Sequence, residues 1–410
     1  MKNHHFLSIF LGILCSFASI SGSVFGTENV TEDIWLTISD EKAGTVTVSW
    51  LSPAAGVSRV FFGKDAECKE ASIEVKSEEV GKTDETKTFL NFVPIPVMEK
   101  VGADSRCFYR TETKMADGTV YRSVVKSFAT LATDELRLAF VGNVHTRTIP
   151  ETVPAQKPHI VCLTGDMVPK LWENGMLAEV ARENVKPFCL LVAKNRELFA
   201  STLLMVVLGN HDREIVKRGE RVPGPSVSYD TEGGAFCRFF ALPGDRWKWF
   251  IDWEPLSFRL VGLDLNHIYD HGTSLQSSHA WQVDSEQFQW FERVMNCEKK
   301  FIVTFQNEKC STVRSSEKAT WEKVLAHGDA LIAGFGHYAE RAEKDGVKYF
   351  NTSYYGCGDK YPDRFKTYFE SRDNFLLLTV QPEKWCTNSV TFTTQPSSTE
   401  ANRGKRIENR

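Results

Sequence analysis

Residue types that bind metals follow a glycine at four points of this 410-residue sequence. Each of the four segments comes after an apolar run; they are Gly142-Asn143-Val144-His145, Gly165-Asp166, Gly209-Asn210-His211-Asp212 and Gly336-His337-Tyr338-Ala339. Carboxylate, amide and imidazole groups are donors that borderline divalent metals accept. Gly-Asn-His-Asp is the most specific segment, because three polar residues in a row suit neither a core nor an ordinary turn. Together the segments predict a divalent metal site.

An α/β sheet would bring these segments together. From Glu135 onward, short apolar runs alternate with helical patterns; the runs cover 136–141, 160–163, 203–208, 258–263, 301–305 and 330–333. Apolar residues repeat at helical spacing in 173–200, 284–297 and 315–327, and strands return at 347–350, 375–380 and 390–393. This alternation predicts an α/β domain over 135–394. The carboxyl ends of its strands lie at one edge, where the four segments converge.

The hundred residues before this domain show only strand patterns. Between 31 and 131, short alternating runs are separated by turn signals such as Asp117-Gly118, and Trp50 ends an early strand. This predicts a β-sandwich of the immunoglobulin or fibronectin-III kind. It carries no catalytic pattern, so we expect it to brace the second domain.

The two ends of the chain belong to neither predicted domain. Lys2 precedes an apolar run from Phe6 to Ile20 and then small residues, a pattern typical of a secretory signal peptide over 1–26. The run is shorter than the roughly 20 apolar residues of a membrane span, so an uncleaved anchor is the alternative, with lipid attachment at Cys15 a further one. The polar residues 395–410 are predicted to be disordered. We expect a secreted or periplasmic protein whose mature chain has no membrane span.

Composition excludes several other classes of protein. The formal net charge is -4 and no basic stripe is interleaved with aromatic residues, which excludes a nucleic-acid partner. Ten cysteines are present, and nine remain once Cys15 leaves with the signal peptide, so they cannot all pair within one chain. The absence of Cys-x-x-Cys excludes a thiolate zinc cluster and a thioredoxin-type redox pair.

The order of the four segments resembles that of the calcineurin-like metallophosphoesterases, with the architecture of purple acid phosphatases, in which a β-sandwich precedes the catalytic domain. The resemblance covers nearly all of the chain after the signal peptide and implies a metallophosphoesterase αββα sandwich. That family shows Asp-x-His, Gly-Asp, Gly-Asn-His-Asp/Glu, a His after a later strand, and Gly-His-x-His. Its members hold two metal ions, and a metal-activated water hydrolyses a phosphate ester.

The resemblance assigns roles to residues of this chain. It implies that Asp166 is the carboxylate that bridges the metals, and that His211 with Asp212 forms the catalytic acid pair. The metal ligands that it implies are Asp166, Asn210, His337, His145, Asn143 and Gln306.

Three of the family's ligands are replaced here. Asn143 stands for the first Asp, Gln306 for the His after a later strand, and Ala339 for the last His. Asn and Gln offer neutral carbonyl oxygens, and Ala offers no ligand. Because only Asp166 is left to offset the charge of two divalent ions, we expect one ion of Fe, Mn or Zn rather than two, or none.

Three hypotheses for the function remain open at this stage. The first is an exported phosphoesterase with weakened metal binding, which acts on a phosphate ester with His211 as the acid. The second is an inactive pseudo-phosphatase that binds a phosphate-like anion or a partner. The third is a structural or adhesive surface protein that uses its N-terminal sandwich for contact.

Overall fold

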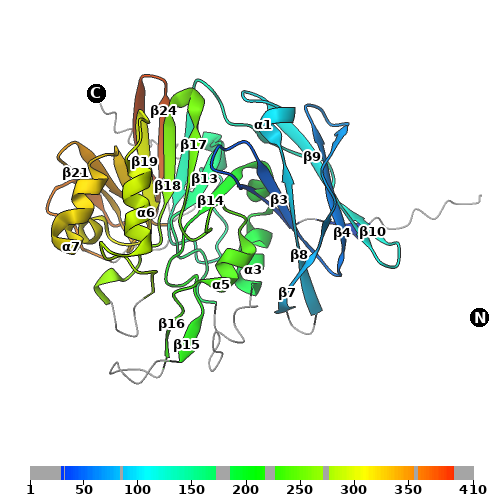
Figure 1. Cartoon of the computed structure of the whole chain (residues 1–410), viewed down its shortest axis with the longest axis horizontal. Coiled ribbons are helices and arrows are strands. Elements are labelled where there is room, and N and C mark those ends of the chain that lie inside the picture. Colours follow the sequence, from blue (N-terminus) through cyan, green and yellow to red (C-terminus); the bar gives the residue numbers. More distant parts are fainter. Residues whose placement is uncertain are drawn as a thin grey trace, which may run out of the picture.

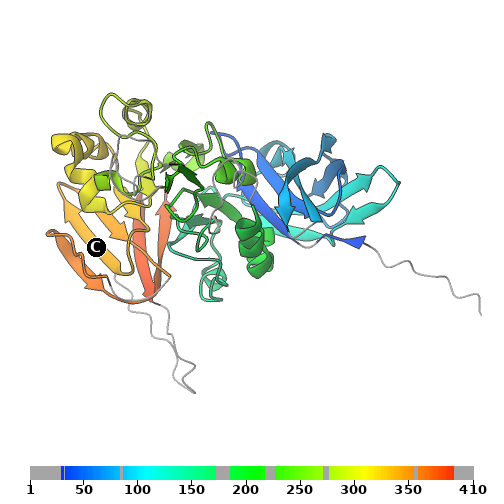
Figure 2. The same ribbon diagram turned by 90° about the horizontal axis from the view of Figure 1, so that it is seen from below.

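The computed structural model describes residues 29–31, 33–83, 86–171, 185–217, 227–270, 277–354 and 359–391. The predicted signal peptide and the predicted disordered tail lie outside these residues. Within them, no helix combines the length and the apolar character that crossing a membrane requires. The described chain forms an elongated molecule, with the N-terminal strands at one end and the strands after residue 330 at the other (Figure 2).

The N-terminal region is a pair of facing sheets, as predicted. One of them has seven strands, namely β1 (Asn29–Val30), β4 (Gly56–Gly63), β5 (Glu70–Ala71), β6 (Val75–Lys76), β9 (Arg106–Met115), β10 (Val120–Arg122) and β11 (Lys126–Ala129). The buried Trp50 links it to the facing sheet through a hydrogen bond from its indole Nε1 to Thr113 Oγ1, 2.9 Å. The fibronectin-III or immunoglobulin identity of this region stays a prediction.

The facing sheet has nine strands and continues into the α/β region. Its order is β25-β24-β12-β13-β14-β2-β3-β8-β7. The strands are β2 (Ile34–Ile38), β3 (Val46–Ser52), β7 (Glu78–Thr83), β8 (Thr86–Ile95), β12 (Leu136–Val141), β13 (Ile160–Leu163), β14 (Leu203–Val206), β24 (Asn374–Gln381) and β25 (Lys384–Thr391). β14 pairs in parallel with β2, through Leu203 with Leu36 and Leu204 with Thr37. One sheet therefore crosses the boundary that the sequence predicts between the two domains.

A third large sheet packs against the nine-stranded sheet where that sheet contains β12. It has the order β17-β18-β19-β20-β22-β21-β23, formed by β17 (Trp249–Trp253), β18 (Phe258–Gly262), β19 (Phe301–Gln306), β20 (Ala330–Ala333), β21 (Ala339–Lys344), β22 (Val347–Asn351) and β23 (Lys366–Glu370). Phe140 of β12 meets Phe305 of β19 edge-on, with ring centroids 5.4 Å apart, so the two sheets share a core. Because both rings are fully buried, truncating either would cost about 3–5 kcal/mol.

Helices cover the outer faces of the two sheets and complete the αββα arrangement (Figure 1). The helices are α1 (Val97–Lys100), α3 (Lys186–Lys194), α4 (Arg196–Ser201), α5 (Gly234–Phe239), α6 (Glu286–Met295) and α7 (Cys310–Leu325), with 3-10 turns η1 (Pro154–Gln156), η2 (Glu254–Leu256) and η3 (Ile268–Asp270). A two-stranded ribbon joins β15 (Ile215–Lys217) to β16 (Val227–Tyr229). Ser285 caps α6 by accepting from Phe288 N, 3.2 Å, and the buried Phe288 and Phe291 pack on Trp321 of α7.

Two predicted helices differ from the structure. The described part of 173–200 holds two helices, α3 and α4, which meet at Asn195. The helix predicted over 315–327 begins earlier, at Cys310, and four residues from Ser316 to Ala319 leave helical geometry. Glu317, Lys318 and Ala319 have positive φ values of 51°, 56° and 65°, a left-handed conformation that is uncommon for residues other than glycine.

Helix α4 fastens the N-terminal region to the α/β region. Tyr109 of β9 donates from its hydroxyl to the carbonyl oxygen of Ala200, 2.7 Å. At the rim, Lys126 contacts Glu197 at 3.0 Å and Arg196 contacts Asp33 at 2.7 Å. The helix therefore packs against both regions at their junction.

Candidate metal centre

The site lies where the parallel strands of the two large α/β sheets end. β12, β13 and β14 run parallel in one sheet, and β18, β19 and β20 run parallel in the other. We call the loops after the first three strands the first-sheet loops, and those after the second three the second-sheet loops. Asn307, which follows β19, donates to the carbonyl oxygen of Thr164 after β13, 2.8 Å. The predicted convergence of distant loops is therefore present.

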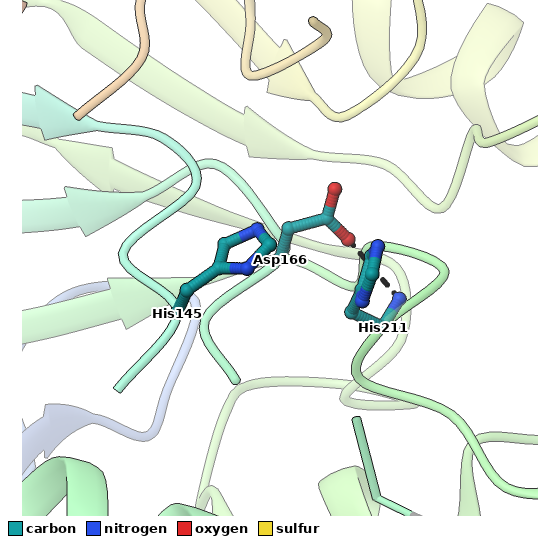
Figure 3. A group of neighbouring side chains, drawn as sticks. All are labelled: His145, Asp166 and His211. Carbon is teal, nitrogen blue, oxygen red and sulfur yellow. Dashed lines mark hydrogen bonds between the residues drawn. The ribbon is translucent and has the colours of Figure 1, made fainter. Parts of the chain in front are cut away.

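Three side chains of the first-sheet loops converge on one point. His145, Asp166 and His211 each offer a ligand atom, and these atoms all lie within 4.8 Å of one another. Figure 3 shows Asp166 between the two imidazole rings. The ring centroids of His145 and His211 are 5.0 Å apart.

Strained backbone holds this cluster in place. Asn143, His145 and Asp166 have φ values of 52°, 49° and 52°, in the left-handed region. Such residues cost of the order of 1–3 kcal/mol each and tend to occur at functional sites. The two loops are joined by His145 N donating to the carbonyl oxygen of Asp166, 3.2 Å, which offsets part of that cost.

Gly209 allows the third loop to approach. A Cβ atom at this position would overlap the carboxylate and the backbone nitrogen of Asp166, so no larger residue fits without a shift. Two residues later, His211 N donates to Asp166 Oδ1 at 3.1 Å. The glycine of the Gly-Asn-His-Asp segment thus allows its loop to lie close to the Asp166 loop.

The His211 ring is oriented by a backbone carbonyl. Its Nδ1 lies 2.5 Å from the carbonyl oxygen of Pro169. Because a carbonyl oxygen only accepts, the proton of the neutral ring lies on Nδ1, and the lone pair lies on Nε2. Metal-ligating histidines show the same arrangement, in which the second nitrogen donates to a carbonyl or carboxylate.

Burial keeps His145 neutral. The ring is largely removed from water, which lowers its pKa from 6.5 to about 4. The Asp166 carboxylate acts in the opposite direction, while His211, His337 and Arg147 lower the pKa further. His145 therefore presents a neutral imidazole, the form that binds a metal, throughout the neutral pH range.

Asp212 lies behind the cluster rather than in it. Its side chain is fully buried, Oδ1 accepts from Met167 N at 2.8 Å, and Oδ2 accepts from Gly209 N at 2.9 Å. Burial, with the charge of Asp166 adding to it, raises the pKa of Asp212 to about 7. These bonds tie the Asp166 loop to the His211 loop, so Asp212 positions the two loops, and its part in an acid pair stays a prediction.

Two other predicted ligands, Asn210 and His337, contact neighbouring side chains. Asn210 is half-buried and donates to the hydroxyl of Tyr229, 3.3 Å. His337 follows β20, with Nδ1 3.9 Å from Asp359 Oδ2 and its side chain 33% exposed. His337 is near enough to lower the pKa of His145, although it is not one of the three His and Asp residues whose ligand atoms lie within 4.8 Å of one another. The ligand roles of Asn210 and His337 stay predictions.

Asn143 and Gln306 use their amides in internal hydrogen bonds. Asn143 Nδ2 donates to the carbonyl oxygens of Gly334 and Gly336, at 2.7 and 2.8 Å. Gln306 is fully buried, its Nε2 donates to the Glu308 carbonyl oxygen at 2.7 Å, and its Oε1 accepts from Glu308 N. Both ends of the Gln306 amide are therefore engaged by Glu308, and its ligand role stays a prediction.

Sequence reasoning missed Asp264, which follows β18. This carboxylate is fully buried and accepts from Arg213 Nη2 and from His279 N at 3.0 Å, and His279 Nδ1 lies 2.6 Å from it. The signal was the same as in the four segments, because Gly262-Leu263-Asp264 follows an apolar strand. Arg213, the partner of Asp264, is likewise fully buried, and the two form an ion pair.

Comparison with known proteins identifies the family. Residues 136–359, more than half of the chain, match the model of the calcineurin-like phosphoesterases. The chain belongs to this family. The predicted resemblance is thereby confirmed, and the αββα layers follow from the same membership. No protein with a curated description matches the sequence.

Two solved structures show the same fold as this calcineurin-like phosphoesterase. The purple acid phosphatase PPD1 from yellow lupin (Lupinus luteus) seeds has a TM-score of 0.60 and 12% identity, over 88% of this chain and 72% of that one. A structure of PhoD has a TM-score of 0.63 and 12% identity, over 92% of this chain and 90% of that one. At this level of identity the likeness concerns the fold.

The donors of the cluster fit a divalent metal ion. Two imidazole nitrogens and one carboxylate oxygen form the set that zinc hydrolases and non-haem iron sites use with open coordination positions. The set also retains one negative charge, which two neutral imidazoles alone would lack. The family and this donor set together support the use of a divalent metal by this calcineurin-like phosphoesterase.

Proposed function

We propose that this protein is an exported phosphoric ester hydrolase that works with a single divalent ion held by His145, Asp166 and His211. The observation that carries the proposal is the convergence of these three side chains at the ends of β12, β13 and β14. Family membership supplies the substrate class, a phosphate ester. Export rests on the signal-peptide pattern of the sequence.

The chain's own residues provide orientation and charge. His145 stays neutral because of its burial, and the Pro169 carbonyl oxygen holds the proton of His211 on Nδ1, which leaves a lone pair on Nε2 of His211 for a metal ion. Asp166 supplies the negative charge, and Asp212 holds its loop against that of His211. When bound, a divalent ion in such a set polarises a phosphoryl oxygen and lowers the pKa of water.

The test measures metal content and turnover on the same purified protein. Purified protein is analysed for bound Mn, Fe and Zn by mass spectrometry and assayed with p-nitrophenyl phosphate in each metal. We expect about one ion per chain, and a loss of kcat/KM on the order of a thousandfold in Asp166→Asn, because a polarising ion contributes several kcal/mol. The exposed His327 offers a matched control, and His327→Ala should retain both metal and turnover.

The variant His211→Ala distinguishes a metal-ligand role of His211 from a role as the catalytic acid. As a ligand, its loss should remove both metal and turnover. Retained metal without turnover would instead give His211 the acid role that the resemblance implies and would overturn the three-residue ligand set. Absence of both metal and turnover in the unaltered protein would contradict the proposal that it is a hydrolase.

A second candidate is an inactive phosphate-binding protein. The internal hydrogen bonds of Asn143 and Gln306 favour it, because they occupy two positions that hold metal in the intact family pattern. It predicts phosphate binding without turnover in any of the three metals.

A further inference from the structure

A cavity lies beside α7, outside the cluster of His145, Asp166 and His211. It has a volume of about 500 Å³ and opens between α7 and the segment that leads into β23. None of the three clustered residues, and none of the other predicted metal ligands, lines it. It is therefore a separate candidate for a binding site.

The cavity is strongly cationic for a protein whose formal net charge is -4. Two carboxylates line it, Glu322 and Asp363, together with five cationic side chains, Lys309, Arg314, Lys318, Lys344 and Arg364. The wall thus carries an excess of three positive charges. A concave, positively charged wall concentrates anions.

The two carboxylates are already engaged. Asp363 accepts from Arg314 Nη2 through both oxygens, at 3.0 and 2.9 Å, and Glu322 pairs with Lys344. Within the described part of the chain, no ion pair joins a carboxylate to Lys309, Lys318 or Arg364. The charge excess is therefore available to a ligand.

Arg314 gives the second, independent indication of a ligand. The residue is 5% exposed, and its guanidinium carbon lies 4.7 Å from the ring centre of Tyr349 and 5.0 Å from that of Phe365. Its buried Nη1 has no hydrogen-bond partner among the described residues. A buried donor without an acceptor costs about 1–3 kcal/mol, and an anion oxygen that met Nη1 after a small shift of the side chain would recover that cost.

We propose that this cavity is an anion site that binds the phosphate group of a small phosphorylated molecule. Arginine matches phosphate because its planar fork presents paired N–H groups, and three uncompensated positive charges suit a dianion better than a single carboxylate. Tyr269, 80% exposed, lines the cavity and offers a ring face to the remainder of the ligand. This site does not depend on the proposed hydrolase.

Calorimetric titration of EDTA-treated full-length protein tests the site. Inorganic phosphate and AMP are the probes, and AMP should bind more tightly if Tyr269 contacts its base. Lys318 and Arg364 are both exposed, so their replacement should not prevent folding. We expect Lys318→Gln/Arg364→Gln to weaken binding of both anions at least tenfold.

A matched pair of exposed cations is the control. Lys323 lies on the same helix and Lys366 lies two residues after Arg364, yet neither lines the cavity. Lys323→Gln/Lys366→Gln removes the same net charge and should leave binding unchanged. Arg314→Lys keeps the charge but loses the fork, and should weaken phosphate binding severalfold.

Three results would overturn the proposal. The first is the absence of binding of either probe to the unaltered protein. The second is equal weakening in the two double variants, which would reduce the effect to net charge. The third is loss of binding in His211→Ala, which would assign the anion to the cluster at β12, β13 and β14.

Discussion

The first-sheet loops and the second-sheet loops differ in what their polar side chains contact. After β12, β13 and β14, His145, Asp166 and His211 bring their ligand atoms within 4.8 Å of one another (Figure 3). Asp264, which follows β18, and Gln306, the last residue of β19, are fully buried and bonded to neighbouring protein atoms. A strand-end position therefore does not by itself make a ligand.

The difference shows that the proposed metal centre is one-sided. The first-sheet loops supply three donors and the strained turns that aim them. The second-sheet loops supply support, since the Gly334 and Gly336 carbonyl oxygens fix Asn143. Variants that turn a positioning residue into a potential ligand, or that remove a positioning residue, test this difference between the two groups of loops.

Asn143→Asp should have the largest effect on stability. A carboxylate in place of the Nδ2 group would face the Gly334 and Gly336 carbonyl oxygens, so we expect a loss of about 3 kcal/mol in the free energy of unfolding in EDTA. Excess Zn or Mn should recover part of it by offsetting the new charge. Urea titration measures both quantities.

Asn143→Ala is the control for this variant. It removes the same hydrogen bonds without adding charge, so it should lose less stability and gain nothing specific from metal. Equal recovery of Ala and Asp variants by metal would contradict a new ligand at this position.

Asp212→Asn should cost about 2 kcal/mol at pH 8. One half of the new amide would oppose the N–H of Gly209 or of Met167, donor against donor. Turnover should fall as well, because the Asp166 and His211 loops lose their tie. Asp117 accepts one backbone N–H from Thr119 at an exposed turn, so Asp117→Asn should change stability by less than about 0.5 kcal/mol in the same urea titration.

The pH dependence of stability should report His145. Its pKa is lowered on folding, so its contribution is complete above 6.5 and is lost as the pH falls toward about 4. In EDTA, the unaltered protein should lose about 1.5 kcal/mol more than His145→Gln between pH 7 and 4.5. The raised pKa of Asp212 acts with the opposite sign in both proteins, so the difference between them isolates His145. Parallel profiles would show that folding does not lower the pKa of the ring.

Gln306→Ala should have the smallest effect on turnover. Because both ends of its amide bond to Glu308, kcat/KM per folded molecule should change by less than about twofold. A tenfold fall accompanied by loss of metal would return Gln306 to the ligand set and would abolish the contrast between the two groups of loops.

Much of the fold could be predicted because local patterns encode it. The strands at 136–141, 160–163 and 330–333 have the predicted bounds, since each is a buried apolar run that ends at a polar or glycine-rich turn. The pairing of β14 with β2 could not be predicted, because an apolar strand buried on both faces does not specify its neighbour. The break in α7 likewise has no glycine or proline to indicate it.

The candidate site likewise has features that the sequence predicts and features that it does not. Residue type and strand-end position suffice to find His145 and Asp166 as candidate ligands and His211 as a candidate acid, and all three roles stay predictions. The contacts of Asn143 could not be predicted, because its partner Gly334 lies 191 residues away and offers a backbone atom that carries no sequence signal. A sequence shows which side chains could bind a metal, but it does not show which of them are already hydrogen-bonded to distant backbone groups.

The pairing of β14 with β2 has a consequence for the α/β region taken alone. A fragment that begins at Glu135 would lack β2, and β14 would present a row of open N–H and C=O groups at the edge of its sheet. The residues of β14, Leu203–Val206, are all apolar and buried, so this edge would also be hydrophobic. Exposed edges of that kind template self-association. The N-terminal strands therefore act as a protective cap against aggregation, independently of any catalytic contribution.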